Sequence, residues 1–249
     1  MHVCTTFYDP SGQNAATICT SAARHGIAVA NFGAKSRFDG FLRTKLIPLR
    51  NHLAGVANDI VLFLDGNDTI IEADEKEILA AWGRFGGVVV GSELVNWPYA
   101  HLKGKMDALA AKAGSKSPYH YLDTGLIMGR RQEVIGVLDA VIASVPQYAA
   151  AMPATKKEIL EDDVGLFALN ITDGRIGVTI DYGCALIAAL RNVNDRKAYS
   201  FVGGRLFLRA TKTKPCVVHC NGHRKVDRLR LIRLSEKLIG KPGWKMKKA

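Results

Sequence analysis

The chain has 249 residues, of which 48% are hydrophobic, enough for one large α/β domain or two small ones with a substantial core. Its formal net charge of +11 is unevenly placed: residues 191–249 hold 17 Lys or Arg against 3 Asp or Glu, whereas residues 1–190 hold 17 against 20. This asymmetry points to a polyanionic partner, above all nucleic acid, or else to a solvated basic tail that aids solubility.

Two features bear on location and redox state. No apolar run approaches the roughly 18–20 residues that span a bilayer, and the first residues carry neither a basic region nor a cleavable apolar stretch. We therefore expect no membrane contact and a cytoplasmic location, in the host cytoplasm if the protein is viral. The five cysteines are few, odd in number and mostly inside apolar runs, so buried free thiols are expected rather than disulfides.

The first part of the chain alternates between short apolar runs and helix-like segments. Pro48 is expected to kink one helix or to mark its start, because proline lacks the backbone N–H that a helix interior needs. The alternation predicts an α/β fold of the Rossmann type, with a mostly parallel sheet and helices on both faces. The expected elements are strand 2–8, helix 13–26, strand 27–33, helix 41–56, strand 60–64, helix 73–86 and strand 87–93.

The second part of the chain has a looser pattern. Pro146 and Pro153 predict a loop after an amphipathic helix, and Gly125 interrupts a strand-like run. Neither a repeat nor a linker stands out, so one domain over residues 1–249 is expected, with a basic C-terminal extension from about 223 to 249. The expected elements are strand 121–129, helix 131–145, helix 156–170, strand 175–190, strand 215–222 and a basic helix over 229–240.

Asp65 and Asp68 directly follow the apolar run 60–64. In open parallel sheets, ligands bind beyond the carboxyl ends of the strands. Two acids three residues apart across a tight turn can share one hard divalent cation, and a cation with open positions can hold the phosphate oxygens of a nucleoside diphosphate. The alternative is a purely structural turn, in which Asp is common.

A second pattern follows the last predicted strand. His219, Gly222 and Lys225 form H-x-x-G-x-x-K, in which the imidazole can bind a metal, the glycine lets backbone approach a phosphate and the lysine can neutralise a diphosphate. The competing interpretation is a zinc site. In a continuous strand, however, Cys216 and Cys220 would face away from His219, and a distant second ligand pair is missing. The residues of that alternative are Cys216, His219, Cys220 and His223.

A third acidic group, Glu161, Asp162 and Asp163, precedes an apolar helix-like run. Adjacent acids at this place can cap a helix N-terminus. They can equally place a carboxylate to deprotonate or orient an acceptor hydroxyl.

Six short segments carry a further pattern in chain order: VLFLDGNDTII, VVVGSELVNWP, YLDTGLIMG, EDDVGLF, VTIDYGCALIAAL and VVHCNG. Together they resemble motifs of the glycosyltransferase domain of lysyl hydroxylases and the related procollagen glycosyltransferases, which are metal-dependent enzymes of the GT-A class. The chain departs from that pattern in carrying Asn67 where the family often has Tyr, Val164 where it has Gln, and Asp123 where it has Asn.

The resemblance implies a GT-A-like fold and a glycosyltransferase activity. It implies that Asp65, Asp68 and His219 hold Mn²⁺, or Mg²⁺, which binds the diphosphate of a nucleotide-sugar donor, a UDP-sugar above all. Asp162 and Asp163 would be catalytic residues near the sugar and the acceptor. The positions implied to bind the donor are Thr5, Thr6, Lys45, Asp123, Thr124, Gly125, Asn221, Gly222 and Lys225.

The acceptor hydroxyl is expected from the charge asymmetry to belong to a hydroxymethyl base in DNA, as in viral DNA modification, with Arg230 and Arg233 of the last helix holding phosphates. Apolar Leu229 and Ile232 are expected to dock that helix. A hexosyl- or pentosyltransferase acting on a protein hydroxyl, such as a hydroxylysine, or on a glycan is the alternative. Two other classes are a non-enzymatic nucleic-acid-binding module and a sugar-nucleotide pyrophosphorylase, although the latter normally has a Gly-rich basic loop that TTFYDPSGQN lacks.

Overall fold

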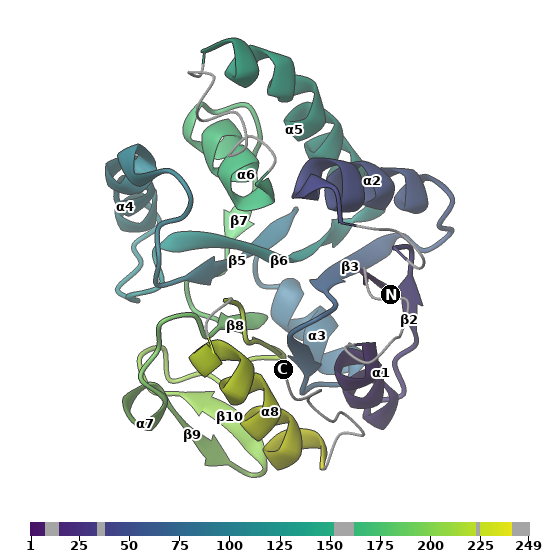
Figure 1. Cartoon of the computed structure of the whole chain (residues 1–249), viewed down its shortest axis with the longest axis vertical. Helices are drawn as coiled ribbons and strands as arrows, with labels where there is room; N and C mark the ends of the chain where they lie inside the picture. Colours follow the sequence, from purple (N-terminus) through teal and green to yellow (C-terminus); the bar gives the residue numbers. More distant parts are fainter. Residues whose placement is uncertain (8–14, 34–37, 152–161, 223–224, 241–249) are drawn as a thin grey trace.

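The computed structural model describes residues 1–7, 15–33, 38–151, 162–222 and 225–240, and it has the α/β architecture that the sequence predicts (Figure 1). Sequence-based assignments that concern residues outside these ranges include the acid Glu161, the zinc-ligand candidate His223, the loop residue Pro153 and the start of the helix expected over 156–170.

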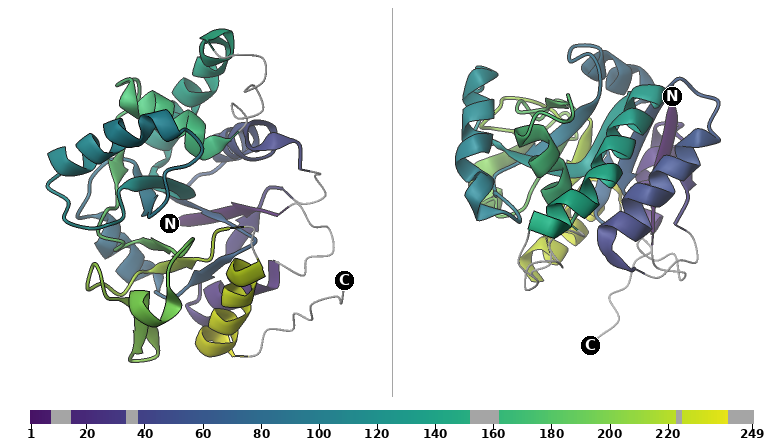
Figure 2. Two further views of the ribbon diagram at one scale, coloured as in Figure 1. Left: turned by 60° about the vertical axis from the view of Figure 1, so that its left-hand side comes forward. Right: turned by 90° about the horizontal axis from the view of Figure 1, so that it is seen from above.

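A six-stranded sheet forms the centre of the molecule (Figures 1 and 2). Five of its strands run in one direction, and β6 runs antiparallel to both of its neighbours, β3 and β5. The mostly parallel sheet is therefore confirmed, with one reversed strand. In spatial order its members are β2 (Val29–Asn31), β1 (His2–Thr6), β3 (Ile60–Asp65), β6 (Tyr121–Arg130), β5 (Val89–Glu93) and β7 (Thr179–Ile180).

Helices cover both faces of this sheet, because alternate side chains of its buried strands point to opposite faces. In β3, Val61 and Phe63 belong to the core on one face, while Leu62 and Leu64 belong to the core on the other. The first face is covered by a π-helical turn (Leu42–Leu46) that continues as α2 (Ile47–Ala54), and by α4 (Lys103–Lys112), α5 (Arg131–Ala151) and α6 (Asp163–Thr172). The second face is covered by α1 (Ala15–Arg24) and α3 (Glu75–Trp82).

A smaller sheet lies beside the main one and completes the fold. The segment 175–190, predicted as one strand, forms β7 and β8 because the carboxylate of buried Asp181 accepts backbone N–H groups of Ala185, Leu186 and Ile187 and folds the chain into a turn. Its strands are β4 (Thr69–Ile71), β11 (Val217–His219) and β8 (Ile187–Ala189), in the order β4-β11-β8. Next to it lie α7 (Asp195–Ala198) and the hairpin β9 (Tyr199–Val202) and β10 (Arg205–Leu208).

The helix α5 corrects two expectations. Pro146 lies inside it rather than in a loop, because buried side chains on both sides, Val141 and Tyr148, outweigh the lost backbone hydrogen bond. The second expectation was that no apolar run approaches the length that spans a bilayer. Within the described ranges, α5 is the one helix long and apolar enough to do so by length and composition, with a mean hydropathy of 1.5 over its most apolar window. It packs against α2, α6 and β6 in the manner of a core helix.

The last described helix, α8 (Lys225–Ile239), packs onto a third apolar core through Leu234. Leu229, expected to dock the helix, is 39% exposed, whereas Arg230 is 1% exposed. The inward face of α8 is thus partly ionic. Residues 241–249, the rest of the predicted basic extension, lie outside the described ranges, and that extension stays a prediction.

Arg230 joins α8 to the loops beneath it. Its guanidinium pairs with Asp195 at 2.6 Å and with Asp227 at 3.0 Å, and it donates hydrogen bonds to the carbonyl oxygens of Leu190 and Val193. The expectation that Arg230 contacts a DNA phosphate is therefore wrong, since the side chain is buried and each of its three nitrogens already donates within the protein. Arg233 pairs with Asp195 at 2.8 Å but is 60% exposed.

Removing these two arginines should have very different effects on folding. Arg230→Ala removes a buried guanidinium from Asp195, Asp227 and two backbone carbonyl oxygens, and should lower the free energy of unfolding by about 3–5 kcal/mol. Arg233→Ala breaks an exposed pair and should cost less than about 1 kcal/mol. Urea denaturation of both variants checks this, and equal losses would contradict the structural role assigned to Arg230.

Candidate functional site

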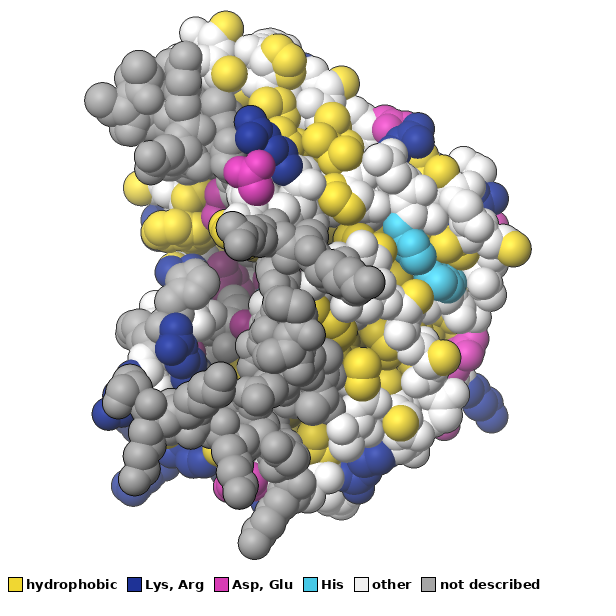
Figure 3. Space-filling model, turned by 45° about the vertical axis from the view of Figure 1, so that its right-hand side comes forward, with side chains coloured by type: hydrophobic (Ala, Val, Ile, Leu, Met, Phe, Trp, Pro, Cys, Tyr) yellow, Lys and Arg dark blue, Asp and Glu magenta, His cyan; other side chains and the backbone are white. Residues whose placement is uncertain are grey.

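A pocket of about 700 Å³ opens at the carboxyl ends of the central strands. Thr6, Asp65 and Glu93 are the last residues of β1, β3 and β5, and all three line it. Acidic side chains are visible inside a hollow on the face drawn in Figure 3. The pocket is therefore where ligands of open α/β sheets bind.

Asp65, Asp68 and His219 meet in this pocket because two sheets adjoin there. The main-sheet strand β3 ends at Asp65, a short turn follows, and β4 then pairs with β11 in a register that sets Thr69 opposite His219. The Nε2 atom of His219 consequently lies 3.2 Å from Asp68 Oδ1 and 3.8 Å from Asp65 Oδ2. The structure thus brings together the three residues expected to hold the metal.

The imidazole of His219 is held from its other side. Its Nδ1 lies 3.0 Å from Asp123 Oδ2, which directs Nε2 toward Asp65 and Asp68. Burial opposes a charge on His219, but Asp123 and Asp68 outweigh it and hold the pKa of the imidazole well above its ordinary value. Gly125 makes room for the ring, since a Cβ there would lie 2.3 Å from His219 Cε1. Gly125 therefore positions a ligand residue, a role that the strand pattern did not reveal.

Lys45 connects the acids of β3 and α6. Its Nζ lies 2.8 Å from Asp65 Oδ1 and 2.5 Å from Asp163 Oδ2, and it donates to the carbonyl oxygen of Thr124. Burial disfavours the ammonium, but Asp163 and Asp65 more than compensate and raise the pKa of Lys45 above its ordinary value. Burial in turn raises the pKa of Asp65 to about 6, despite the opposing charges of Lys45 and His219.

Asp162 and Asp163 have different environments. Asp162 caps α6 by accepting from Gly165 N, and its other oxygen accepts from Trp97 Nε1 at 2.9 Å. Burial first, and Asp163 second, raise the pKa of Asp162. Asp163 is buried and also accepts from the hydroxyl of Thr124 at 2.6 Å. The helix-cap interpretation thus holds for Asp162, although both acids also line the pocket.

The other positions implied to bind a donor divide into two groups. Thr6, Asn221 and Gly222 line the pocket, and within the described parts of the chain the buried Thr6 Oγ1 has no hydrogen-bond partner. Thr5 is fully buried behind them and donates to the carbonyl oxygen of Leu64. Lys225 is exposed at the start of α8 and is absent from the described pocket lining.

No role in the site was assigned from the sequence to several pocket residues. Glu93 is 2% exposed, accepts from Asn221 Nδ2 at 2.9 Å, and has its pKa raised to about 8 by burial and by Asp123. The guanidinium of Arg191 lies 5.1 Å from the ring centroid of Trp97, and both line the pocket. The sequence signal that could have marked Glu93 as a site residue was its place at the end of an apolar run, as for Asp65.

The donor set fits a hard or borderline divalent cation. Two carboxylate oxygens and one imidazole nitrogen converge, and Asp123 at Nδ1 fixes the ring, as carboxylates behind metal-binding histidines commonly do. This arrangement does not support the zinc alternative. Cys216 and Cys220 are 1% and 2% exposed, and they pack in two different apolar cores rather than around a shared point.

A sequence model of one family, the PLOD GT domain, matches residues 17–145, just over half of the chain. The chain belongs to this family. No curated protein sequence matches it. A PLOD GT domain is a glycosyltransferase domain, so the family membership agrees with the resemblance seen in the sequence motifs and favours an enzyme over a nucleic-acid-binding module.

Solved structures similar to this PLOD GT domain are glycosyltransferases as well. An active-site mutant of LgtC matches with a TM-score of 0.54 at 15% identity, covering 95% of each chain. A glycosyltransferase involved in glycosylation of the major capsid of PBCV-1 matches with a TM-score of 0.50 at 7% identity, over 92% of this chain and 98% of that one. The bifunctional glycosyltransferase WbbM matches at 0.50 and 13% identity, over 99% of this chain and 50% of that one.

These likenesses confirm the fold. The PLOD GT domain has the GT-A fold of glycosyltransferases, and with the family membership this makes the protein a glycosyltransferase. The pocket at the carboxyl ends of β1, β3 and β5 is its candidate active site.

The raised pKa of Glu93 predicts a pH-dependent stability. The folded protein holds the proton up to about pH 8, whereas the ordinary value is 4.5, so this contribution is fully present below about pH 4.5 and is lost as pH rises to about 8. Glu93→Gln keeps a neutral group that accepts from Asn221. The stability of the wild type relative to this variant should therefore fall between about pH 5 and pH 8 in urea titrations.

The exposed glutamate Glu133 on α5 provides the matched control. Glu133→Gln should follow the wild-type stability profile over the same pH range. Parallel profiles for all three proteins would show that Glu93 titrates normally.

Proposed function

We propose that the protein transfers a sugar from a nucleotide-diphosphate donor, a UDP-sugar above all, to a hydroxyl acceptor with the help of a divalent metal ion. The observation that carries this proposal is the convergence of Asp65, Asp68 and His219 at the strand ends. Glycosyltransferases with the GT-A fold generally depend on a divalent metal. A pocket of about 700 Å³ has room for a drug-sized or nucleotide-sized ligand.

Asp65, Asp68 and His219 would hold Mn²⁺, or Mg²⁺, which when bound neutralises the charge that develops on the leaving diphosphate. In the transfer, the bond between the anomeric carbon and the diphosphate oxygen breaks, and a bond to the acceptor oxygen forms. The acceptor proton passes to a base and the nucleoside diphosphate leaves. The hydroxyl of Thr6, which has no hydrogen-bond partner among the described residues, the amide of Asn221 and the backbone at Gly222 would orient the donor.

Asp162 and Asp163 serve the sugar and the acceptor in this proposal. Asp162 has a raised pKa and a hydrogen bond from Trp97 at the pocket surface, which suits a group that accepts the proton of the acceptor hydroxyl. Asp163 is held by Lys45 and Thr124 and suits a fixed negative charge that orients the donor sugar.

Loss of any one metal ligand should remove the activity. Asp65→Ala, Asp68→Ala and His219→Ala should each lower Mn²⁺-dependent release of UDP from a UDP-sugar at least about 100-fold, because stabilisation of the leaving group is lost. A luminescent UDP assay with a panel of donors, with and without EDTA, measures this, and circular dichroism checks the fold.

Asp139 on α5 offers a control acid, since it is exposed, pairs with the surface residue Arg50 and is absent from the described pocket lining. Asp139→Ala should keep wild-type turnover. Full activity in EDTA, or in any two of the three ligand variants, would contradict the metal assignment.

For the acceptor, we propose a hydroxymethyl base in DNA. Support comes from the concentration of basic residues after position 190 and from Arg191 and Arg228, which line the pocket. A base would have to be flipped out of the duplex to meet the donor, with the arginines contacting the flanking phosphates.

Transfer to hydroxymethylated DNA should fall steeply with salt. Arg228→Ala should lower the slope of log affinity against log salt concentration by about 0.9, the contribution of one phosphate contact, and should reduce transfer. Arg233 is exposed, so its expected phosphate contact stays part of this proposal. Arg84→Ala is the control, because Arg84 is exposed, precedes the basic segment and is absent from the described pocket lining. Equal transfer by both variants would contradict a phosphate contact of Arg228. Salt-independent transfer to a hydroxylysine peptide or a neutral glycan would make that molecule the acceptor in place of DNA.

A further inference from the structure

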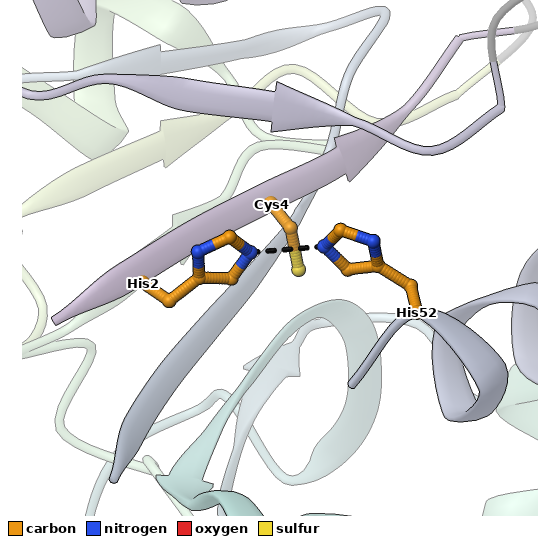
Figure 4. A group of neighbouring side chains, drawn as sticks. All are labelled: His2, Cys4 and His52. Atoms are coloured by element: carbon orange, nitrogen blue, oxygen red, sulfur yellow. Dashed lines mark hydrogen bonds between the residues drawn. The ribbon is translucent and has the colours of Figure 1, made fainter. Parts of the chain in front are cut away.

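A second cluster of ligand-type side chains lies at the opposite end of β1 from the pocket. It consists of His2 and Cys4 from β1 and His52 from α2 (Figure 4). One ligand atom from each residue lies within 4.8 Å of the others, and within the described ranges no other group of His, Cys, Asp and Glu meets this criterion. None of the three residues lines the candidate active site.

The backbone explains why the three side chains meet. His2 and Cys4 are two residues apart on a strand, so both point to the same face of the sheet. Hydrogen bonds to β2 and β3 hold β1 on both sides. The helix α2 packs over that face and presents His52 to the strand, and the sulfur of Cys4 points toward the space between the two rings (Figure 4). The cluster is therefore built on rigid elements.

The two imidazoles have a chemistry suited to binding a metal. Their Nε2 atoms lie 2.9 Å apart, so one donates and the other accepts, and the accepting ring is neutral. Burial lowers the pKa of both His2 and His52, and the neighbouring His52 lowers the pKa of His2 further. The ring of Phe32 stacks on His52 at 5.3 Å and shields one side of the cluster.

We propose that His2, Cys4 and His52 bind a thiophilic divalent metal ion of the zinc type through two Nε2 atoms and the sulfur. Tetrahedral coordination with Zn–N bonds of about 2.0–2.1 Å needs the two nitrogens about 3.3 Å apart, a small opening from the observed 2.9 Å. Both histidines are only partly buried, which leaves a fourth position for water. Binding replaces the proton of the Cys4 thiol by the metal and releases that proton to solvent.

This site differs in chemistry and in role from the candidate active site. Its sulfur and two nitrogens favour Zn²⁺ or Co²⁺, whereas the two carboxylates and one imidazole of the pocket suit Mn²⁺ or Mg²⁺. Because its ligands come from β1 and α2, bound metal would tie the first strand to the helix that covers it. Stabilisation of the fold is therefore the expected consequence.

Cobalt binding tests the proposal directly, because a thiolate ligand gives Co²⁺ an intense near-ultraviolet charge-transfer band that oxygen and nitrogen ligands do not give. Titration of the full chain, without a histidine tag, should produce this band with one equivalent of Co²⁺, and Zn²⁺ should abolish it. Cys4→Ala and His52→Gln should each remove the band. His52→Gln changes a partly exposed side chain, so it remains informative if the buried Cys4 variant fails to fold.

Two further cysteines give matched controls. Cys220→Ala alters the cysteine whose backbone contacts Asp68, and Cys19→Ser alters an exposed thiol. Both should keep the band, and Zn²⁺ should raise the melting temperature of both but not that of His52→Gln. A titration without a band, or a band that survives in Cys4→Ala and His52→Gln, would overturn the proposal.

Discussion

The buried ammonium of Lys45 is the interaction on which the candidate active site depends. Six acidic side chains line one pocket, and repulsion among those that are ionised would open it if no cation lay among them. Lys45 pairs with one acid from β3 and one from α6, so it joins the main sheet to the helix layer at the site itself. The six acids are Asp65, Asp68, Glu93, Asp123, Asp162 and Asp163.

His219 serves the same purpose on the other side of the pocket. It stands between Asp123 and the pair Asp65 and Asp68, and without metal it holds a proton that those acids stabilise. A divalent cation would take the place of that proton at Nε2. The acids thus have a positive charge among them both before and after metal binding, which allows several of them to lie close together on one edge of the sheet.

The sequence was sufficient to predict the strand-end acids but not the contacts that position them. An apolar run followed by Asp65 and Asp68 marks a strand end in any α/β chain, and the motif order identified the family. The register of β4 on β11, which brings His219 to Asp68, depends on non-local pairing that no local pattern reports. The role of Gly125 depends on the position of the His219 ring in the folded protein for the same reason.

The error at Arg230 has a physical cause that also limits other predictions from charge. A helical pattern treats Leu229 and Ile232 as the buried face because they are apolar, yet Asp195 and Asp227 give a guanidinium enough partners to be buried instead. Net charge counted along a segment therefore overstates the charge available to a partner. Only basic residues that remain exposed or line the pocket, such as Arg191 and Arg228, can contribute to the attraction of a polyanion.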